Sequence, residues 1–150
     1  MESVAMRAEG EEKRKIVYIM RGISGSGKST VAREIAGTEG VIHSTDSYFV
    51  SEAGEYKFDP MTIGEKHRLN MADFEKSLLD GKTLVIVDNT NITRRDYEPY
   101  VELARKHGYE VRFKEMPIIG IGEALARNTH NVPREKIELQ KSRWEESETG

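Results

Sequence analysis

An α/β fold, in which helices flank a parallel β-sheet, is the architecture that this sequence of 150 residues predicts. Short apolar runs alternate with longer segments whose apolar residues recur at helical spacing. The segment over residues 83–87 contains a continuous apolar run, as do strands buried on both faces of a parallel sheet. Polar residues follow the first three runs. Because ligands bind at the carboxyl ends of strands in such sheets, we expect a site at that edge.

The amino-terminal half supplies two strands and two helices. Residues 15–20 form a short apolar run, and residues 30–36 carry apolar side chains at helical spacing before a glycine ends the pattern. A brief apolar stretch over residues 40–44 predicts the second strand. A polar loop closed by Pro60 then leads to a helix over residues 61–79.

The carboxyl-terminal half continues this alternation. After the strand over 83–87, a helical pattern over 93–107 ends at a glycine, and apolar residues alternate as in a strand over 109–114. Two shorter helices follow over 121–128 and 133–146, the second with a proline in its first turn. We expect these two helices to form a small lid.

The composition limits the classes of protein that the chain can represent. It has no cysteine, which fits a reducing compartment, and we expect a cytoplasmic protein. A net charge of −3 argues against a scaffold that coats duplex nucleic acid, and no stretch approaches the ~18 apolar residues of a membrane span. We expect one domain over 15–146, between a disordered leader over 1–14 and a flexible tail over 147–150. Nothing in the sequence indicates an oligomeric state.

A glycine-rich segment lies between the first strand and the first helix. Residues 22–29 match the pattern GxxxxGK[ST] of a P-loop in its required context. Backbone amides there form an anion site, Lys28 adds positive charge over the phosphates, and Ser29 offers a hydroxyl to Mg²⁺. The alternative, a turn that binds no ligand, is disfavoured by the full match. We predict a nucleoside triphosphate site formed by Gly22, Ser24, Gly25, Ser26, Gly27, Lys28, Ser29 and Thr30.

Two aspartates that follow predicted strands supply further groups for phosphoryl transfer. This reaction requires a carboxylate that supports Mg²⁺ and often a second one that takes the proton of the attacking hydroxyl. Asp88 follows an apolar strand, as a Walker-B carboxylate does, and Asp46 follows the preceding strand. Either residue is also typical of a turn. Spacing alone does not say which aspartate is the base and which supports the metal.

The transferred phosphoryl group also requires cations that neutralise its developing charge. Arg127 and Arg134 flank a polar loop over residues 128–133 between the last two helices. Arginine is suited to this task, although each of these residues is also typical of an exposed helix surface. We favour Arg127 as the lid arginine.

Residues beside the two aspartates are candidates for binding the phosphoryl acceptor. Tyr48 and Phe49 follow Asp46, while Asn89 and Asn91 follow Asp88. Aromatic side chains can stack on a base or a sugar. The aromatic residues are equally typical of a hydrophobic loop packed on the helix over 61–79.

Five segments in a fixed order give the sequence a family resemblance. It resembles the P-loop kinases of the polynucleotide 5′-hydroxyl kinase group, in particular the kinase-like domain of Nedd4-binding protein 2 and its relatives. The likeness spans about Lys15 to Trp144. The segments that carry it are Gly22–Thr30, Ser44–Phe49, Gly54–Pro60, Val87–Asn91 and Arg127–Pro133.

The resemblance implies transfer of the γ-phosphoryl group of ATP to a 5′-hydroxyl. It implies that Asp46 is the general base, that Lys28 and Ser29 bind phosphate and Mg²⁺, and that Arg127 is a lid arginine. Phe49 stands where the phage enzyme of this group has an arginine, and the lid loop is shorter. Three functions therefore stay open: a kinase for a nucleic-acid end, a kinase for a small hydroxyl compound such as a nucleoside or sugar, and a nucleotide-dependent interaction module.

Overall fold

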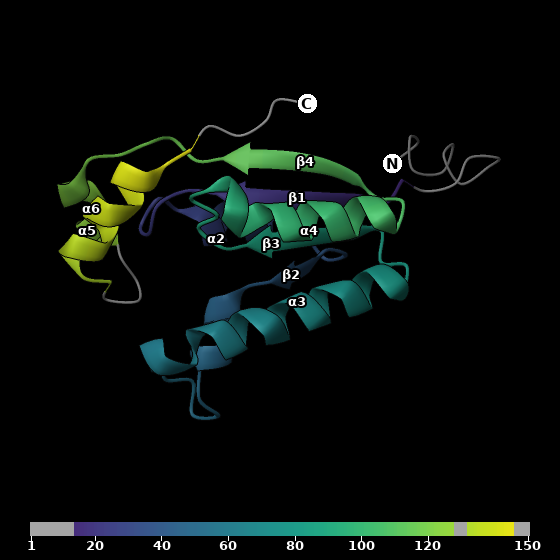
Figure 1. Cartoon of the computed structure of the whole chain (residues 1–150), viewed down its shortest axis with the longest axis horizontal. Coiled ribbons are helices and arrows are strands. Elements are labelled where there is room, and N and C mark those ends of the chain that lie inside the picture. The colour runs from purple at the N-terminus through teal and green to yellow at the C-terminus, as the bar shows by residue number, and fades with distance from the viewer. Residues whose placement is uncertain (1–13, 128–131, 146–150) are drawn as a thin grey trace.

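The strands pair in parallel into one sheet with the order β2-β3-β1-β4. A computed structural model describes residues 14–127 and 132–145 (Figure 1). The central strand β1 pairs with two strands distant in sequence, since Ile16 lies opposite both Leu84 and Glu110. The predicted parallel α/β fold is confirmed. The strands are β1 (Ile16–Arg21), β2 (Val41–His43), β3 (Leu84–Asp88) and β4 (Glu110–Glu115).

Helices cover the sheet on both faces and at its carboxyl edge (Figure 1). The start of α4 carries a capping box, in which Thr93 and Asp96 each accept the backbone N–H of the other. None of the described helices is long and apolar enough to cross a membrane. The helices are α2 (Lys28–Ala36), α3 (Ile63–Leu79), α4 (Arg94–Lys106), α5 (Ile121–Arg127) and α6 (Arg134–Arg143).

Successive side chains of each strand point to opposite faces of the sheet, so the apolar side chains form a separate cluster on each face. Val17 and Ile19 belong to a core cluster with Phe74 of α3 and Tyr97 of α4. Met20, which is fully buried, belongs to a second cluster with alanines of α2. The apolar runs are therefore continuous because both faces are covered, as the sequence predicts.

The short helices α5 and α6 pack together at the carboxyl ends of the strands (Figure 1). Their buried residues Ala124 and Ile137 form a third apolar cluster with Ile23 and Ile92. Ile23 belongs to the P-loop, and Ile92 follows β3. The predicted small helical pair is thus fixed to the edge of the sheet that carries the predicted site.

Two regions differ from the sequence-based expectation. A short 3₁₀ helix, η1 (Thr45–Phe49), precedes the expected loop over 51–60. Within this loop, Tyr56 forms an antiparallel bridge with Val50, the residue directly after η1. A second 3₁₀ helix, η2 (Pro60–Thr62), precedes α3. Both 3₁₀ helices contact α3, which places the chain after Asp46 against that helix.

The last helix ends earlier than predicted. It stops at Arg143 and not near residue 146, because the next residues leave the helical path to bond elsewhere. The backbone N–H of Glu145 donates to the carbonyl of Ile92, at a distance of 3.0 Å. The predicted tail over 147–150, nearly all of the predicted leader over 1–14 and most of the lid loop lie outside the described residues.

Candidate active site

The P-loop connects β1 to α2 through a turn that depends on glycine. Gly25 and Gly27 have φ angles of +84° and +91°, a region that favours glycine. A Cβ atom on Gly25 would lie 2.1 Å from the carbonyl oxygen of Ala124 in α5. Glycine at this position therefore permits both the turn and the close approach of the helical pair.

Lys28 lies at the first turn of α2, with its ammonium near both predicted carboxylates. Its Nζ atom donates to the carbonyl of Ile23 over 3.3 Å. Burial lowers the pKa of Lys28, and the charges of Asp88 and then Asp46 act in the opposite direction. The structure thus brings these three groups within mutual electrostatic reach at the mouth of the P-loop.

Asp88 ends β3 and faces Ser29 of the P-loop. The Ser29 hydroxyl donates to Asp88 Oδ2 over 2.9 Å, while the buried Oδ1 has no hydrogen-bond partner among the described residues. Burial raises the pKa of Asp88, and the bond from Ser29 and the charge of Lys28 oppose this rise. A free carboxylate oxygen beside a hydroxyl is a donor set that suits Mg²⁺.

The remaining ligands of such an ion would have to come from water and phosphate. Across residues 14–127 and 132–145, no group of three or more His, Cys, Asp or Glu could hold a metal ion. Mg²⁺ is commonly bound through one or two protein oxygens plus substrate phosphates and waters. The pair Ser29 and Asp88 therefore fits a metal that arrives with a nucleotide.

The turn after β3 links the two halves of the site. The side-chain oxygen of Asn89 accepts the backbone N–H of Thr45 over 2.9 Å, which fixes the residue that precedes Asp46. Asn91, only 2% exposed and with φ +48°, donates its amide to the carbonyl of Met20 over 2.7 Å. The prediction that Asn91 contacts substrate is wrong for this arrangement, because its amide is enclosed and bonded to β1.

Asp46 lies in η1, half-buried, and its Oδ1 atom accepts a hydrogen bond from the Tyr56 hydroxyl over 3.1 Å. Its charge raises the pKa of Lys28 and of Asp88, as a nearby carboxylate does. The catalytic residue predicted after the second strand therefore converges with the P-loop lysine and the carboxylate after the third.

The two aromatic residues after Asp46 have structural partners. Phe49 is 5% exposed, and its ring packs against Phe58 with centroids 5.0 Å apart. Tyr48 directs its hydroxyl to Asp73 of α3. The packed-loop interpretation is therefore the correct one for Phe49, whose ring is buried in the fold and not presented to an acceptor.

The helix α6 contacts the P-loop through a two-point hydrogen bond. The backbone N–H of Ser24 donates to Gln140 Oε1 over 2.8 Å, and Gln140 Nε2 donates to Ser24 Oγ over 3.0 Å. Further along the loop, the Ser26 hydroxyl is buried without a hydrogen-bond partner in the described part of the chain, and Thr30 is exposed on α2. Gln140 carries no sequence signal, since glutamine is an ordinary helix residue.

The predicted lid arginines lie on the helical pair. Arg127 is exposed one turn beyond Ala124 and forms an ion pair with Glu123 over 2.7 Å. Arg134 is paired with Glu138 over 3.2 Å. The structure places Arg127 on the helix that touches Gly25, and its catalytic role stays a prediction. Residues 128–131 of the lid loop lie outside the described residues.

One residue that organises the site was missed by sequence reasoning. Arg21, at the end of β1, is fully buried, and its guanidinium donates to the carbonyls of Asn91, Ile92 and Glu145. It also forms an ion pair with Glu115 over 2.9 Å. No local pattern in the sequence marks this residue, because its backbone partners lie 70 or more positions further along the chain.

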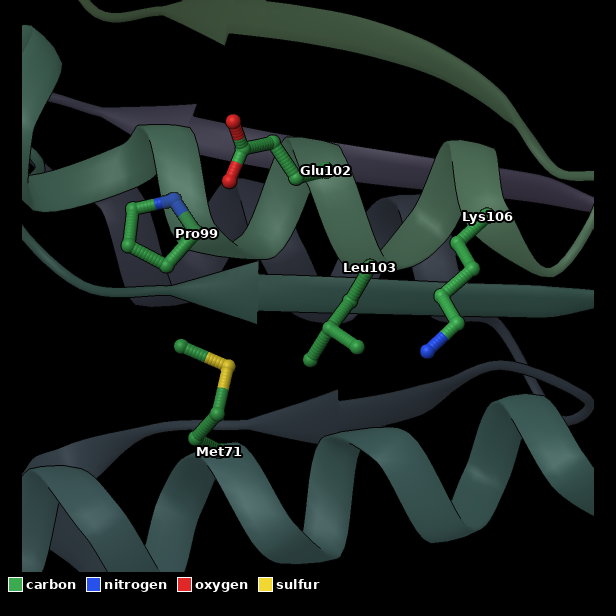
Figure 2. A pocket seen from close by; sticks show the side chains of 5 residues that line it. All are labelled: Met71, Pro99, Glu102, Leu103 and Lys106. Carbon is green, nitrogen blue, oxygen red and sulfur yellow. The ribbon is translucent and has the colours of Figure 1, made fainter.

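The structure also has a groove away from this site, between α3 and α4. It has a volume of about 360 Å³ and contains none of the predicted site residues. Figure 2 shows the Met71 side chain of α3 directed toward Pro99 and Leu103 of α4. The groove is therefore a gap between two helices that pack on the same face of the sheet.

Comparisons with known proteins agree with this geometry. The sequence profile of the AAA domain family, AAA_33, matches residues 17–119. NEDD4-binding protein 2 of Homo sapiens is 38% identical over 127 residues, which cover 81% of this chain and 7% of that protein. The chain thus spans a small part of this relative, and the resemblance seen in the sequence is confirmed.

Solved structures share the fold. The chain is similar to one in the structure of the Pnkp1/Rnl/Hen1 RNA repair complex, with a TM-score of 0.69 and 23% identity over 91% of this chain and 46% of that chain. It is also similar to a sugar kinase from Janibacter sp. HTCC2649, with a TM-score of 0.60 and 20% identity over 90% of this chain and 80% of that one. By its sequence, its parallel sheet and its P-loop, the chain belongs to the AAA_33 family of kinase-like P-loop domains.

Proposed function

We propose that the chain is an ATP- and Mg²⁺-dependent kinase that transfers the γ-phosphoryl group to the 5′-hydroxyl of a polynucleotide. The observation that carries this proposal is the convergence of Asp46 and Asp88 on the Lys28 ammonium. A protein that only binds a nucleotide needs a phosphate cradle and a metal ligand. A second carboxylate near the same lysine suits a reaction in which a hydroxyl loses its proton.

The chemistry follows from the positions of these side chains. The P-loop amides and Lys28 would bind the phosphates of ATP. Ser29 and Asp88 would hold Mg²⁺, which would supply positive charge next to those phosphates. The Asp46 carboxylate takes the proton of the acceptor hydroxyl while its oxygen bonds to the γ-phosphorus. The bond from the γ-phosphorus to the oxygen bridging it to the β-phosphate breaks, and ADP leaves. We assign to Arg127 the neutralisation of charge on the transferred phosphoryl group.

Cationic side chains beside the Asp46 segment favour a polyanionic acceptor. Lys136 of α6 lies over the Phe58 ring at 4.4 Å, and Lys66 of α3 lies 5.9 Å from the Phe49 ring. The Phe58 ring packs in turn against Phe49, three residues after Asp46, with centroids 5.0 Å apart, so Lys136 lies next to the segment that carries the proposed base. A nucleic-acid strand that places its 5′-hydroxyl at Asp46 would find cations for its phosphates there.

The proposal is tested with an Asp46→Asn variant. We expect the rate of labelling of a 5′-hydroxyl oligonucleotide by ATP to fall by about 10²- to 10⁴-fold, because a positioned general base is lost. ATP binding should persist, since the P-loop is unchanged. Asp80→Asn, at the end of α3, is the matched control and should keep full activity. An Asp46→Asn variant with full activity would refute the proposal.

A kinase for a small hydroxyl compound is the second candidate, favoured by the structural likeness to a sugar kinase. The two functions differ in their dependence on the acceptor. Equal transfer to a mononucleoside and to an oligonucleotide would reject the polynucleotide function. A nucleotide-dependent interaction module is the third candidate, and absence of transfer to any acceptor in a broad screen would support it.

The proposal concerns the domain over 15–146 and not the longer proteins that contain similar segments. We place the kinase in the cytoplasm, because a chain without cysteine suits a reducing compartment. This location is part of the proposal and is tested by imaging the tagged protein in cells.

A further inference from the structure

We propose that Tyr56 is a positioning residue that sets the orientation of the Asp46 carboxylate for proton transfer. The inference rests on the proposed function, since it assigns a role within the same reaction. The Tyr56 hydroxyl donates to Asp46 Oδ1 over 3.1 Å, across a separation of ten residues in the chain. None of the motifs in the sequence assigns a role to this tyrosine.

The backbone around Tyr56 holds its ring against Asp46. Tyr56 forms an antiparallel bridge with Val50, and the N–H of Lys57 donates to the carbonyl of Phe49 over 2.8 Å. The Phe49 ring, which is buried, contacts the Tyr56 ring edge-on with centroids 6.3 Å apart. The segment between Val50 and Tyr56 therefore turns back on itself, and the buried phenylalanine anchors it.

This arrangement fixes Asp46 from two directions. Asn89 holds the backbone of the preceding residue, Thr45, and Tyr56 holds one oxygen of the side chain. With Oδ1 engaged by a donor, the carboxylate keeps one rotational setting and Oδ2 is the oxygen that accepts the proton of the acceptor hydroxyl. A base whose orientation is fixed before the reaction starts transfers a proton faster than one that rotates freely.

The chemistry of the tyrosine suits this role. Burial, the charge of Asp46 and the hydrogen bond to Asp46 together raise the pKa of Tyr56 above its ordinary value. The phenol therefore stays protonated at physiological pH and remains a donor. A phenylalanine at this position would keep the ring contact with Phe49 and would lose the hydrogen bond to Asp46.

The experiment compares Tyr56→Phe, Asp46→Asn and the double variant in steady-state kinetics with ATP and a 5′-hydroxyl oligonucleotide. We expect Tyr56→Phe to lower kcat by about 10- to 100-fold, with the KM for ATP unchanged, because misplacement of a reacting group has effects of this size. The double variant should be no slower than Asp46→Asn alone, since a positioning residue has no effect once its base is gone.

Tyr109→Phe is the matched control. Its hydroxyl also donates a hydrogen bond, to the carbonyl of Lys82 over 2.5 Å, but at the opposite end of the sheet. We expect this variant to keep the kcat of the unsubstituted chain. Thermal unfolding of both variants shows whether they lose comparable stability, so that a slower Tyr56→Phe enzyme is not explained by unfolding.

The possible results separate the inference from the proposed function. An unsubstituted chain that phosphorylates no acceptor overturns both. An active chain whose Tyr56→Phe variant keeps its kcat overturns the inference alone. The inference is also wrong if the double variant is slower than Asp46→Asn by the full factor seen for Tyr56→Phe, because that additivity means the tyrosine acts independently of the base.

Discussion

Replacement of Arg21 by methionine should destabilise the fold by several kcal/mol. The guanidinium is fully buried, stacks at 4.3 Å from the Trp144 ring centroid and donates to Asn91, Ile92 and Glu145 carbonyls. Methionine has a similar length and keeps part of the packing, so the main effect is the loss of the hydrogen bonds and of the positive charge.

The magnitude follows from what the change leaves behind. The carbonyls of Asn91 and Ile92 accept buried bonds from the guanidinium at 2.7 and 2.8 Å, and a hydrogen bond to a charged group contributes about 1.5–3 kcal/mol. The Ile92 carbonyl keeps the N–H of Glu145 as a donor after the substitution, so its loss lies at the low end of this range. The carbonyl of Glu145 and the Glu115 carboxylate are partly exposed, so water can replace the guanidinium there. The two buried bonds together give a loss of about 3–5 kcal/mol.

The assay is thermal unfolding and urea unfolding, each followed by circular dichroism and by the fluorescence of Trp144, the single tryptophan of the chain. For a domain of this size we expect the Tm to fall by roughly 6–20 °C. The control is Arg112→Met, because Arg112 pairs with Glu110 on the surface, where solvent screening leaves an ion pair little effect on stability. If Arg21→Met lost no more stability than Arg112→Met, the argument that Arg21 holds the site together would be refuted.

Three further predictions concern the P-loop, the pH dependence and the acceptor. Gly25→Ala should weaken ATP binding and should lower the Tm more than Gly108→Ala does. Both positions have φ near +84°, but only a Cβ atom on Gly25 would collide with Ala124. Equal losses in the two variants would contradict this reasoning. Burial lowers the pKa of His43, so below about pH 6.5 the unfolded chain binds a proton that the folded chain does not. The folded state therefore becomes less stable as the pH is lowered from 6.5. As the pH falls from 6.5 to the lowered pKa, the unsubstituted chain should lose up to about 1.4 kcal/mol of unfolding free energy per pH unit that the His43→Gln variant keeps. Urea titrations at several pH values measure this difference, and an equal pH dependence in the two chains would count against the reasoning. Lys136→Gln should raise the KM for an oligonucleotide and should reduce the slope of log binding constant against log salt concentration by about 0.7. Lys106→Gln should change neither quantity. Fluorescence anisotropy measures the slopes, and identical slopes for the Lys136→Gln variant and the unsubstituted chain would exclude a phosphate contact.

Local signals in the sequence predicted most of the fold. The segments that form β1 and β3 are apolar because helices cover both faces of the sheet. Burial on both faces requires apolar side chains at successive positions, and a local sequence pattern shows this directly. Gly108 ended the predicted helix over 93–107 because its φ of +83° lies outside the helical region. The P-loop was predicted for the same reason, since its glycines and Lys28 act within eight successive positions.

The parts of the site that depend on distant partners were not predictable. Arg21 donates to residues that lie 70 to 124 positions further along the chain, and no local pattern distinguishes it from a surface arginine. The contact of Gln140 with Ser24 spans 116 positions. Asn91 was assigned to substrate because its residue type suits an acceptor contact. Its burial against Met20 is set by the turn geometry, which the sequence does not state.

The pairing of β1 determines when the phosphate site can form during synthesis of the chain. Among the described strands, β1 pairs with β3 and β4 alone. Ile16 can therefore contact both of its partners only after Leu84 and Glu110 have left the ribosome. Contacts of this sequence separation slow folding, because the intervening chain must be closed into a loop first. A nascent chain that has exposed the P-loop but not β4 should therefore bind no nucleotide, and ATP should stabilise only chains that already include β4.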